Sequence, residues 1–196
     1  TMVCVGKKAP DFSCQAAIKE EIVNVTLKDF DGKYKLIFFY PLDFTFVCPT
    51  ELHAFQDRLS DFQDRNVQVL GASVDSVDSH LKWLQTPKNK GGIEGVSYPL
   101  LSDVSRAIIR DYGVLCDDEN VAFRGMFLLD KDNVVQSMQI NNLSIGRSID
   151  EVLRLIDALQ FVEEHGQVCP ANWSKGDKAM TPNEQGLNEY FGDSSS

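Results

Sequence analysis

The chain has 196 residues, enough for one well-buried core, and its 43% apolar and 24% charged residues are ordinary for a globular protein. Its 19 basic and 29 acidic side chains give a net charge of −10, which argues against a phosphate-binding surface. Nucleic acid and membranes are therefore not expected as partners, and no apolar run is long enough to span a bilayer.

Strand and helix patterns alternate along the first half of the chain. KLIFFY at 35–40 is a short apolar run typical of a buried strand. After Cys48-Pro49, apolar residues recur every three or four positions as far as Phe62, which predicts one amphipathic helix. VQVLGASV at 67–74 predicts a second buried strand, and SVDSHLKWLQ directly after it predicts another helix.

The second half continues with a short helix around SRAIIRDYG, and then a hairpin at 125–140 whose strands flank a Lys-Asp-Asn turn. The clearest helix pattern runs over 148–164, where Ser148 and Glu151 match a capping box and Gly166 is a natural terminator. Six apolar residues are expected to form its buried face: Ile149, Val152, Leu153, Ile156, Leu159 and Val162.

This alternation of strands and helices, together with the hairpin, predicts an α/β protein with a central mixed sheet flanked by helices. We expect residues 1–166 to form the packed domain. Residues 167–196 are polar and weakly patterned, and are expected to be a C-terminal extension of the same structural unit. The chain contains no internal repeat.

The cysteines favour a reducing compartment. There are five, Cys4, Cys14, Cys48, Cys116 and Cys169. Their odd number, wide scatter and the lack of a secretory segment predict a cytoplasmic protein in which any disulfide is transient. No histidine is spaced with cysteine as in a zinc site, and neither a metal nor an organic cofactor is predicted.

Cys48 is expected at or next to the N-cap of a helix, because Pro49 suits the first helical position. The unpaired N–H groups there favour a thiolate. A helix terminus contributes only about 0.3–1 kcal/mol, whereas one pKa unit is about 1.4 kcal/mol, so a reactive sulfur also needs a nearby cation. By position alone, a nucleophile and inert packing are equally supported for Cys48, and packing is favoured for Cys4, Cys14 and Cys116.

Several motifs, in order along the chain, resemble those of the typical two-cysteine peroxiredoxins. Pro41, Thr45 and Cys48 form a P-x-x-x-T-x-x-C arrangement within FYPLDFTFVCPTEL, which is similar to the active-site signature of that family. GQVCPANW around Cys169 resembles its resolving-cysteine motif, and FRGMFLLD with Arg124 resembles the strand that carries its active-site arginine. GRSIDEVLRLIDALQF resembles its long helix, and NEYFGD its C-terminal Tyr-Phe segment.

The resemblance runs from about Lys7 to Phe191 and implies a thioredoxin-like fold and a thiol-dependent peroxidase acting on hydrogen peroxide and organic hydroperoxides. It implies that Cys48 attacks the peroxide and becomes a sulfenic acid. Cys169 of a second chain would then form a disulfide with it across a homodimer, and thioredoxin or a similar dithiol protein would reduce that bond. The sequence by itself does not distinguish this pairing from a disulfide within one chain. Assembly of dimers into a decamer is also implied.

The resemblance further assigns roles around the sulfur. Thr45 would hydrogen-bond the thiolate and the peroxide, and Pro41 would wall the pocket. Arg124 would stabilise the thiolate and would be oriented by the paired hydrogen bonds that it donates to Glu51, with Arg147 a weaker candidate for the same network. Without the resemblance, Thr45 is interpreted as a turn residue, Glu51 as a solvated carboxylate and Arg147 as a surface charge. Arg124 needs a partner in either case, because its strand is apolar.

Two other functions remain as alternatives. A disulfide oxidoreductase typically uses C-x-x-C, but Cys48 is followed by Pro-Thr-Glu. A binding or holdase protein would carry its thiols incidentally. The loop 91–94 reads Gly-Gly-Ile-Glu, with Glu94 where overoxidation-prone members of the family have glycine, and we expect intermediate sensitivity of Cys48 to overoxidation.

Overall fold

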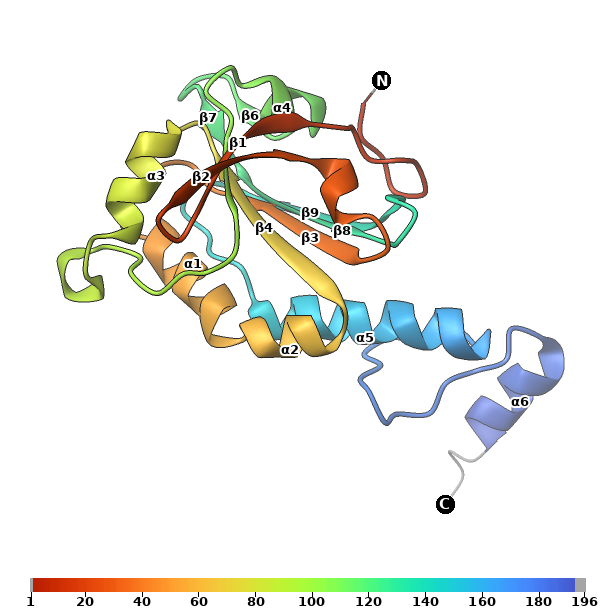
Figure 1. Cartoon of the computed structure of the whole chain (residues 1–196). Coiled ribbons are helices and arrows are strands. Elements are labelled where there is room, and N and C mark those ends of the chain that lie inside the picture. The colour runs from red at the N-terminus through yellow and green to blue at the C-terminus, as the bar shows by residue number, and fades with distance from the viewer. Residues whose placement is uncertain (1, 193–196) are drawn as a thin grey trace. The chain divides into compact units, whose positions relative to one another are not determined.

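The computed structural model describes residues 2–192, and a seven-stranded mixed sheet lies at its centre (Figure 1). The strand order is β2-β1-β5-β4-β3-β8-β9, with β3, β4 and β5 parallel and the other neighbours antiparallel. The strands are β1 Ser13–Ile18, β2 Glu21–Thr26, β3 Tyr34–Phe39, β4 Val67–Ser73, β5 Leu100–Ser102, β8 Arg124–Leu129 and β9 Val135–Asn141. A separate two-stranded ribbon pairs β6 Leu115–Cys116 with β7 Val121–Ala122.

Six α-helices and two short 3-10 helices accompany these strands in the described part of the chain. They are α1 Cys48–Asp57, α2 Leu59–Asp64, α3 Val77–Leu84, α4 Ala107–Asp111, α5 Ile149–His165, α6 Glu184–Gly192, η1 Leu27–Phe30 and η2 Lys88–Lys90. None of the helices within residues 2–192 has the length and apolar character needed to cross a membrane.

The chain divides into two compact units, the first ending at Arg147 and the second beginning at Ser148. This division falls before α5, whereas the expected domain of residues 1–166 includes that helix. The expected boundary at 166/167, and the view of residues 167–196 as an extension of one structural unit, stay predictions.

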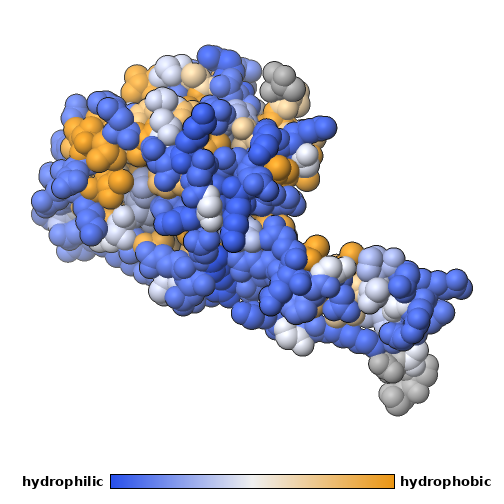
Figure 2. All heavy atoms as spheres, turned by 45° about the vertical axis from the view of Figure 1, so that its right-hand side comes forward, coloured by the Kyte–Doolittle hydropathy of each residue, from blue (hydrophilic) through white to orange (hydrophobic). Residues whose placement is uncertain are grey.

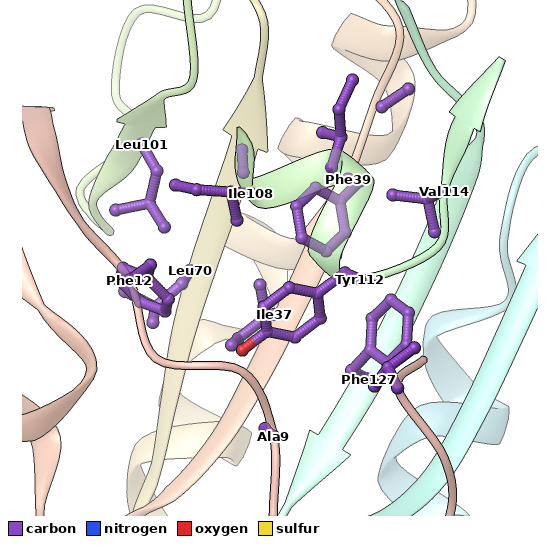
Figure 3. Packing of buried hydrophobic residues seen from close by; sticks show 14 of the residues in the cluster. Ala9, Phe12, Ile37, Phe39, Leu70, Leu101, Ile108, Tyr112, Val114 and Phe127 are labelled. Atoms are coloured by element: carbon purple, nitrogen blue, oxygen red, sulfur yellow. The ribbon is translucent and has the colours of Figure 1, made fainter. Parts of the chain in front are cut away.

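In the first unit, β3 is buried on both faces, which explains its continuous apolar run. Phe38 stacks on Phe55 of α1 with ring centroids 4.2 Å apart, while Phe39 points to the other face and packs 5.4 Å from Tyr112, directly after α4 (Figure 3). Figure 1 shows α1 and α2 on the opposite side of β3 and β4 from α4. The prediction of a mixed sheet flanked by helices is confirmed.

The helix predicted from Cys48 to Phe62 is in fact two helices. Arg58, with φ −109° and ψ 12°, interrupts the helical backbone between α1 and α2, and its guanidinium bonds Asp61 at 2.5 Å. The apolar stripe nevertheless faces the core, because Phe55 and Phe62 are both fully buried. The spacing of the apolar residues therefore predicted the buried face correctly, and only the break at Arg58 was not predicted.

The predicted hairpin is present as β8 and β9, which pair antiparallel. The hairpin of β1 and β2 and the helix α6 were not predicted from the sequence. Lys19 lies in the turn between β1 and β2 with φ 56°, a left-handed conformation that is uncommon for lysine. The turn contains neither glycine nor asparagine, the residues that usually indicate a tight hairpin turn in a sequence.

In the second unit, α5 confirms the predicted helix but makes only half of the expected capping box. Ser148 Oγ accepts the backbone N–H of Glu151 at 3.4 Å, whereas the Glu151 carboxylate binds Arg154 at 2.6 and 2.7 Å. Gly166 ends the helix with φ 64°, as expected. The buried face is shorter than expected, since Leu159 is only half-buried and Val162 is exposed.

Most of the face in Figure 2 is hydrophilic, and hydrophobic residues gather there in small groups.

Lys35 is a residue of β3 whose side chain is fully buried, although lysine side chains usually lie at the surface. Its Nζ has no hydrogen-bond partner among residues 2–192. Burial lowers the pKa of Lys35, and nearby carboxylates, led by that of Asp31, offset this shift only in part.

We predict that Lys35→Met raises the free energy of unfolding at pH 7 by about 1–3 kcal/mol, because it removes an unpaired buried amine. The pKa of Lys35 in the folded protein lies below the value of about 10.4 for unfolded lysine, so the unfolded chain binds more protons between these values. The stability of the unaltered protein therefore rises with pH across that window, and its difference from the variant shrinks.

Urea unfolding of both proteins between pH 6 and pH 10.5 measures this difference. Lys33→Met, at an exposed lysine two residues away, is the control and should change stability by less than about 0.5 kcal/mol. A Lys35→Met protein that is less stable than the unaltered protein at pH 7 would contradict the prediction.

Candidate active site

Cys48 lies at the start of α1 and its side chain is fully buried. It is the first helical residue rather than the cap, since Val47 occupies the cap position and Pro49 comes second in the helix. This position still places the sulfur at the positive end of the helix dipole, which favours an anion. The expected placement at a helix start is therefore correct to within one residue.

Arg124, the first residue of β8, supplies the cation that the sequence argument required. Its Nη1 lies 3.3 Å from Cys48 Sγ, and its Nε donates to the Leu143 carbonyl at 2.6 Å. The residue is only 4% exposed. A hydrogen bond from a guanidinium to sulfur is stronger for a thiolate than for a thiol, so this contact favours ionised sulfur.

Glu51, one turn into α1, joins two buried arginines. Its Oε2 accepts Arg124 Nη1 at 2.8 Å and Arg147 Nη2 at 2.7 Å, while its Oε1 accepts Arg147 Nε at 2.9 Å. The paired hydrogen bonds expected between Glu51 and Arg124 are thus made with Arg147 instead. The interpretation of Arg147 as a surface charge is wrong, because its side chain has no exposed area.

The charges in this buried group do not cancel. Two guanidiniums and the single carboxylate of Glu51 leave one positive charge, which an ionised Cys48 would neutralise. Because an unbalanced charge is costly away from water, the network itself favours the thiolate.

Thr45 and Pro41 lie in the loop between β3 and α1. The Thr45 hydroxyl donates to the Leu42 carbonyl at 2.7 Å, as in a turn, so its proton is not directed at the sulfur. Its oxygen can still accept a hydrogen bond. Pro41 is buried and has no N–H to satisfy, which suits the wall of a pocket.

A second polar group, missed from the sequence, holds this loop in place. Asp43 accepts hydrogen bonds from the Tyr40 hydroxyl at 2.8 Å and the Ser79 hydroxyl at 2.9 Å, and lies 2.7 Å from His80 Nδ1. Burial, the largest single cause, opposes protonation of His80, but the hydrogen bond and charge of Asp43, the Leu101 carbonyl and the charge of Asp75 together raise the pKa of His80. The available signal was a histidine on the apolar face of the helix that also carries Trp83.

Cys169 belongs to the second unit, where its Sγ lies 3.7 Å from the Ala158 carbonyl of α5. Arg154 braces the same segment by donating to the Trp173 carbonyl at 2.9 Å. Burial raises the pKa of Cys169, and the charge of Arg154 opposes this shift. The segment is closed by two backbone hydrogen bonds between Val168 and Met180.

The other cysteines lie apart from this chemistry. Burial, with the charge of Asp103 next, raises the pKa of Cys14 to about 11, and Cys116 is buried as expected. Cys4 is exposed, so the packing interpretation is wrong for that residue. Among residues 2–192, no three His, Cys, Asp or Glu side chains are grouped so that they could hold a metal ion.

Comparisons with known proteins agree with this geometry. The AhpC/TSA family matches residues 5–138, and the C-terminal domain of 1-Cys peroxiredoxin matches residues 158–193. The chain is 53% identical to "2-Cys peroxiredoxin BAS1, chloroplastic" of Hordeum vulgare over 188 residues, covering 95% of this chain and 90% of the relative. It is 48% identical to "Thioredoxin peroxidase" of Echinococcus granulosus over 187 residues, covering 95% and 97%.

A solved structure shares the fold. The reduced 2-Cys peroxiredoxin of Plasmodium vivax superposes with a TM-score of 0.93 at 49% identity, covering 96% of this chain and 98% of that one. The thioredoxin-like fold expected from the sequence is therefore confirmed. With a family match over most of its length and relatives at about half identity, the chain belongs to the AhpC/TSA family and, within it, to the two-cysteine peroxiredoxins.

Proposed function

We propose that Cys48 is the peroxidatic nucleophile of a peroxidase that reduces hydrogen peroxide and organic hydroperoxides. The observation that carries this proposal is the 3.3 Å contact between Arg124 Nη1 and the buried Cys48 Sγ. The thiolate attacks one peroxide oxygen, an S–O bond forms and the O–O bond breaks. The other oxygen leaves with its electron pair and takes up a proton as water or alcohol, and Cys48 becomes a sulfenic acid. Arg124 stabilises the charge that grows on the leaving oxygen.

In this proposal, Thr45 and Pro41 shape the approach of the peroxide. The Thr45 proton is committed to the Leu42 carbonyl, so its oxygen accepts a hydrogen bond from the peroxide O–H. This role is narrower than the one expected from the family motif, in which the hydroxyl also donates to the thiolate. Buried Pro41 lines the pocket without offering a competing donor.

We propose that Cys169 of a second copy resolves the sulfenic acid. Its thiol attacks Cys48 sulfur, an S–S bond forms, and the sulfenic oxygen leaves as water. A disulfide requires Cα atoms within about 7 Å, and Cys48 is fully buried, so the first turn of α1 has to open. A thioredoxin-like dithiol protein then reduces the disulfide, in keeping with a relative named thioredoxin peroxidase.

A homodimer that assembles further, as in a decamer, is part of the same proposal. Three apolar side chains are exposed in the loop before Cys48, namely Leu42, Phe44 and Phe46, and Phe46 is 94% exposed. Apolar groups in one loop support association with another chain. A solved relative, Plasmodium yoelii Prx1a modified at its N-terminus, forms an artifactual octamer. A cytoplasmic location stays a prediction, since similar relatives are named chloroplastic.

We predict that Arg124→Gln slows oxidation of Cys48 by hydrogen peroxide at pH 7 by about tenfold to a hundredfold. A hydrogen bond to a charged group contributes about 1.5–3 kcal/mol, and the variant loses the cation that makes it. Stopped-flow measurement of the first oxidation gives the rate constant. Arg110→Gln, at an exposed arginine of α4, is the matched control and should react like the unaltered protein. Equal rates for the two variants would contradict the role of Arg124.

We predict that Glu51→Gln lowers the free energy of unfolding by about 3–5 kcal/mol, because two buried guanidiniums lose their shared counter-charge. It should also slow Cys48 oxidation, since Arg124 loses the group that orients it. Urea unfolding and the same stopped-flow assay measure both effects. Glu94→Gln, at an exposed carboxylate, should alter neither quantity; if Glu51→Gln resembles it, Glu51 does not organise the site.

We predict that one equivalent of hydrogen peroxide converts the reduced protein to a disulfide-linked dimer on a nonreducing gel. The dimer band should be absent in Cys48→Ser and in Cys169→Ser, while Cys14→Ser, the control, retains it. Cys169→Ser should still form a sulfenic acid at Cys48 that dimedone traps. Normal turnover of Cys169→Ser with thioredoxin would refute the resolving role, and peroxide consumption by Cys48→Ser would refute the peroxidatic one.

A further inference from the structure

Cys169 lies on one face of α5, in a contact that favours its protonated form. Its Sγ is 3.7 Å from the Ala158 carbonyl oxygen, which can only accept a hydrogen bond, so the thiol S–H donates. A thiolate has no proton to donate, and the carbonyl oxygen would repel it. Since the thiolate is the form that attacks sulfur, this contact opposes the reaction proposed for Cys169.

Arg154 lies on the same face of α5, one helical turn before Ala158. Its Nη1 donates to the Trp173 carbonyl at 2.9 Å, which brings the guanidinium against the segment 169–173. Trp173 is only 3% exposed, and its ring centroid lies 4.9 Å from that of Phe161, which also belongs to α5. The segment that carries Cys169 is therefore held on the helix beside a cation.

The guanidinium of Arg154 is paired with a carboxylate on its other side. Its Nε and Nη2 donate to Glu151 at 2.6 and 2.7 Å. The two side chains are 31% and 41% exposed, so water screens the pair in part. Glu151 orients Arg154 and cancels some of its charge, and the two residues should therefore act on Cys169 with opposite signs.

Cys169 is surrounded by α5 and by the segment that returns to Met180. Besides Arg154, the ionisable side chains of these elements are Asp150, Glu151, Asp157, Glu163, Glu164, His165, Lys175, Asp177 and Lys178. Within residues 2–192, the charge that shifts the pKa of Cys169 is that of Arg154. Burial raises this pKa and is the larger cause, while Arg154 opposes it.

We infer that Arg154 is a positioning residue of the resolving step, whose guanidinium stabilises the Cys169 thiolate while Glu151 limits this effect. The inference rests on the proposed function. The thiolate attacks the sulfur of Cys48 in the other copy, an S–S bond forms and the S–O bond of the sulfenic acid breaks. The oxygen leaves with the bonding electron pair and takes up the proton that Cys169 released, which gives water.

The test measures the ionisation of Cys169 in the full-length reduced protein. Cys169 is half-buried, so a small reagent can reach it. The rate of its alkylation by iodoacetamide between pH 6 and pH 10.5, followed by mass spectrometry of the peptide that contains it, reports its pKa. Arg154→Gln should raise this pKa and Glu151→Gln should lower it. The thiolate fraction at pH 7 should change about twofold to fivefold in each variant.

The opposite directions separate this role from a structural one. Both substitutions break the same ion pair, so mere loosening of the segment would shift the pKa of Cys169 in the same direction in both variants. Arg154→Lys keeps the charge without the fork of hydrogen bonds and should restore most of the original pKa. Arg110→Gln, at an exposed arginine of α4, is the control and should leave the pKa unchanged.

The rate of disulfide formation after hydrogen peroxide gives a second measurement. At pH 7 it should be slower in Arg154→Gln and faster in Glu151→Gln, by about 1.5-fold to threefold. The effect on the rate is smaller than that on the thiolate fraction, because a thiolate of lower pKa is a weaker nucleophile. The difference between the variants should shrink as the pH rises towards the pKa of Cys169.

The outcomes distinguish the inference from the function on which it rests. An unchanged pKa of Cys169 in both variants, a shift in the same direction in both, or an unaltered rate of disulfide formation would overturn the inference. Normal oxidation of Cys48 and a disulfide-linked dimer in the same variants would leave the proposed function intact. Absence of that dimer in the unaltered protein would instead overturn the proposed function.

Discussion

The Glu51 carboxylate between two buried guanidiniums is the interaction on which the active site depends. It holds Arg124 so that one nitrogen reaches Cys48 Sγ at 3.3 Å, and it binds Arg147 with two hydrogen bonds. Two positive charges and one negative charge in a buried place leave a need for a further anion. An ionised cysteine would meet that need, so this network supports the proposed role of Cys48 as the nucleophile.

Protection and release of Cys48 make opposite demands on α1. In the proposed function, the buried sulfur beside Arg124 reacts with a small peroxide, but it cannot form a disulfide while the first turn stays closed. Local opening resolves this conflict if the rest of the helix stays folded. The Asp43 group holds the loop that precedes the cysteine.

Much of the fold could be predicted because its strands and helices have strong periods. KLIFFY is buried on both faces of β3, and the pattern after Cys48 does face the core. The break at Arg58, the hairpin turned by Lys19 and the buried amine of Lys35 could not be predicted. Each of them departs from the preference of the residue itself, and tertiary packing can override such a preference.

By itself, the sequence determined the order of strands and helices, the placement of Cys48 at a helix start and the need for a cation beside it. These follow from local rules, since periodicity and helix-terminal chemistry depend on residues close together in the chain. Local rules did not say which arginine lies beside Cys48, and Arg124 was named only through the family resemblance. Which arginine receives the paired bonds of Glu51 was decided only by the tertiary structure. The contacts of Arg124 with Cys48 and of Arg147 with Glu51 join residues 76 and 96 positions apart, and the distances between such residues are set by how the sheet and helices pack.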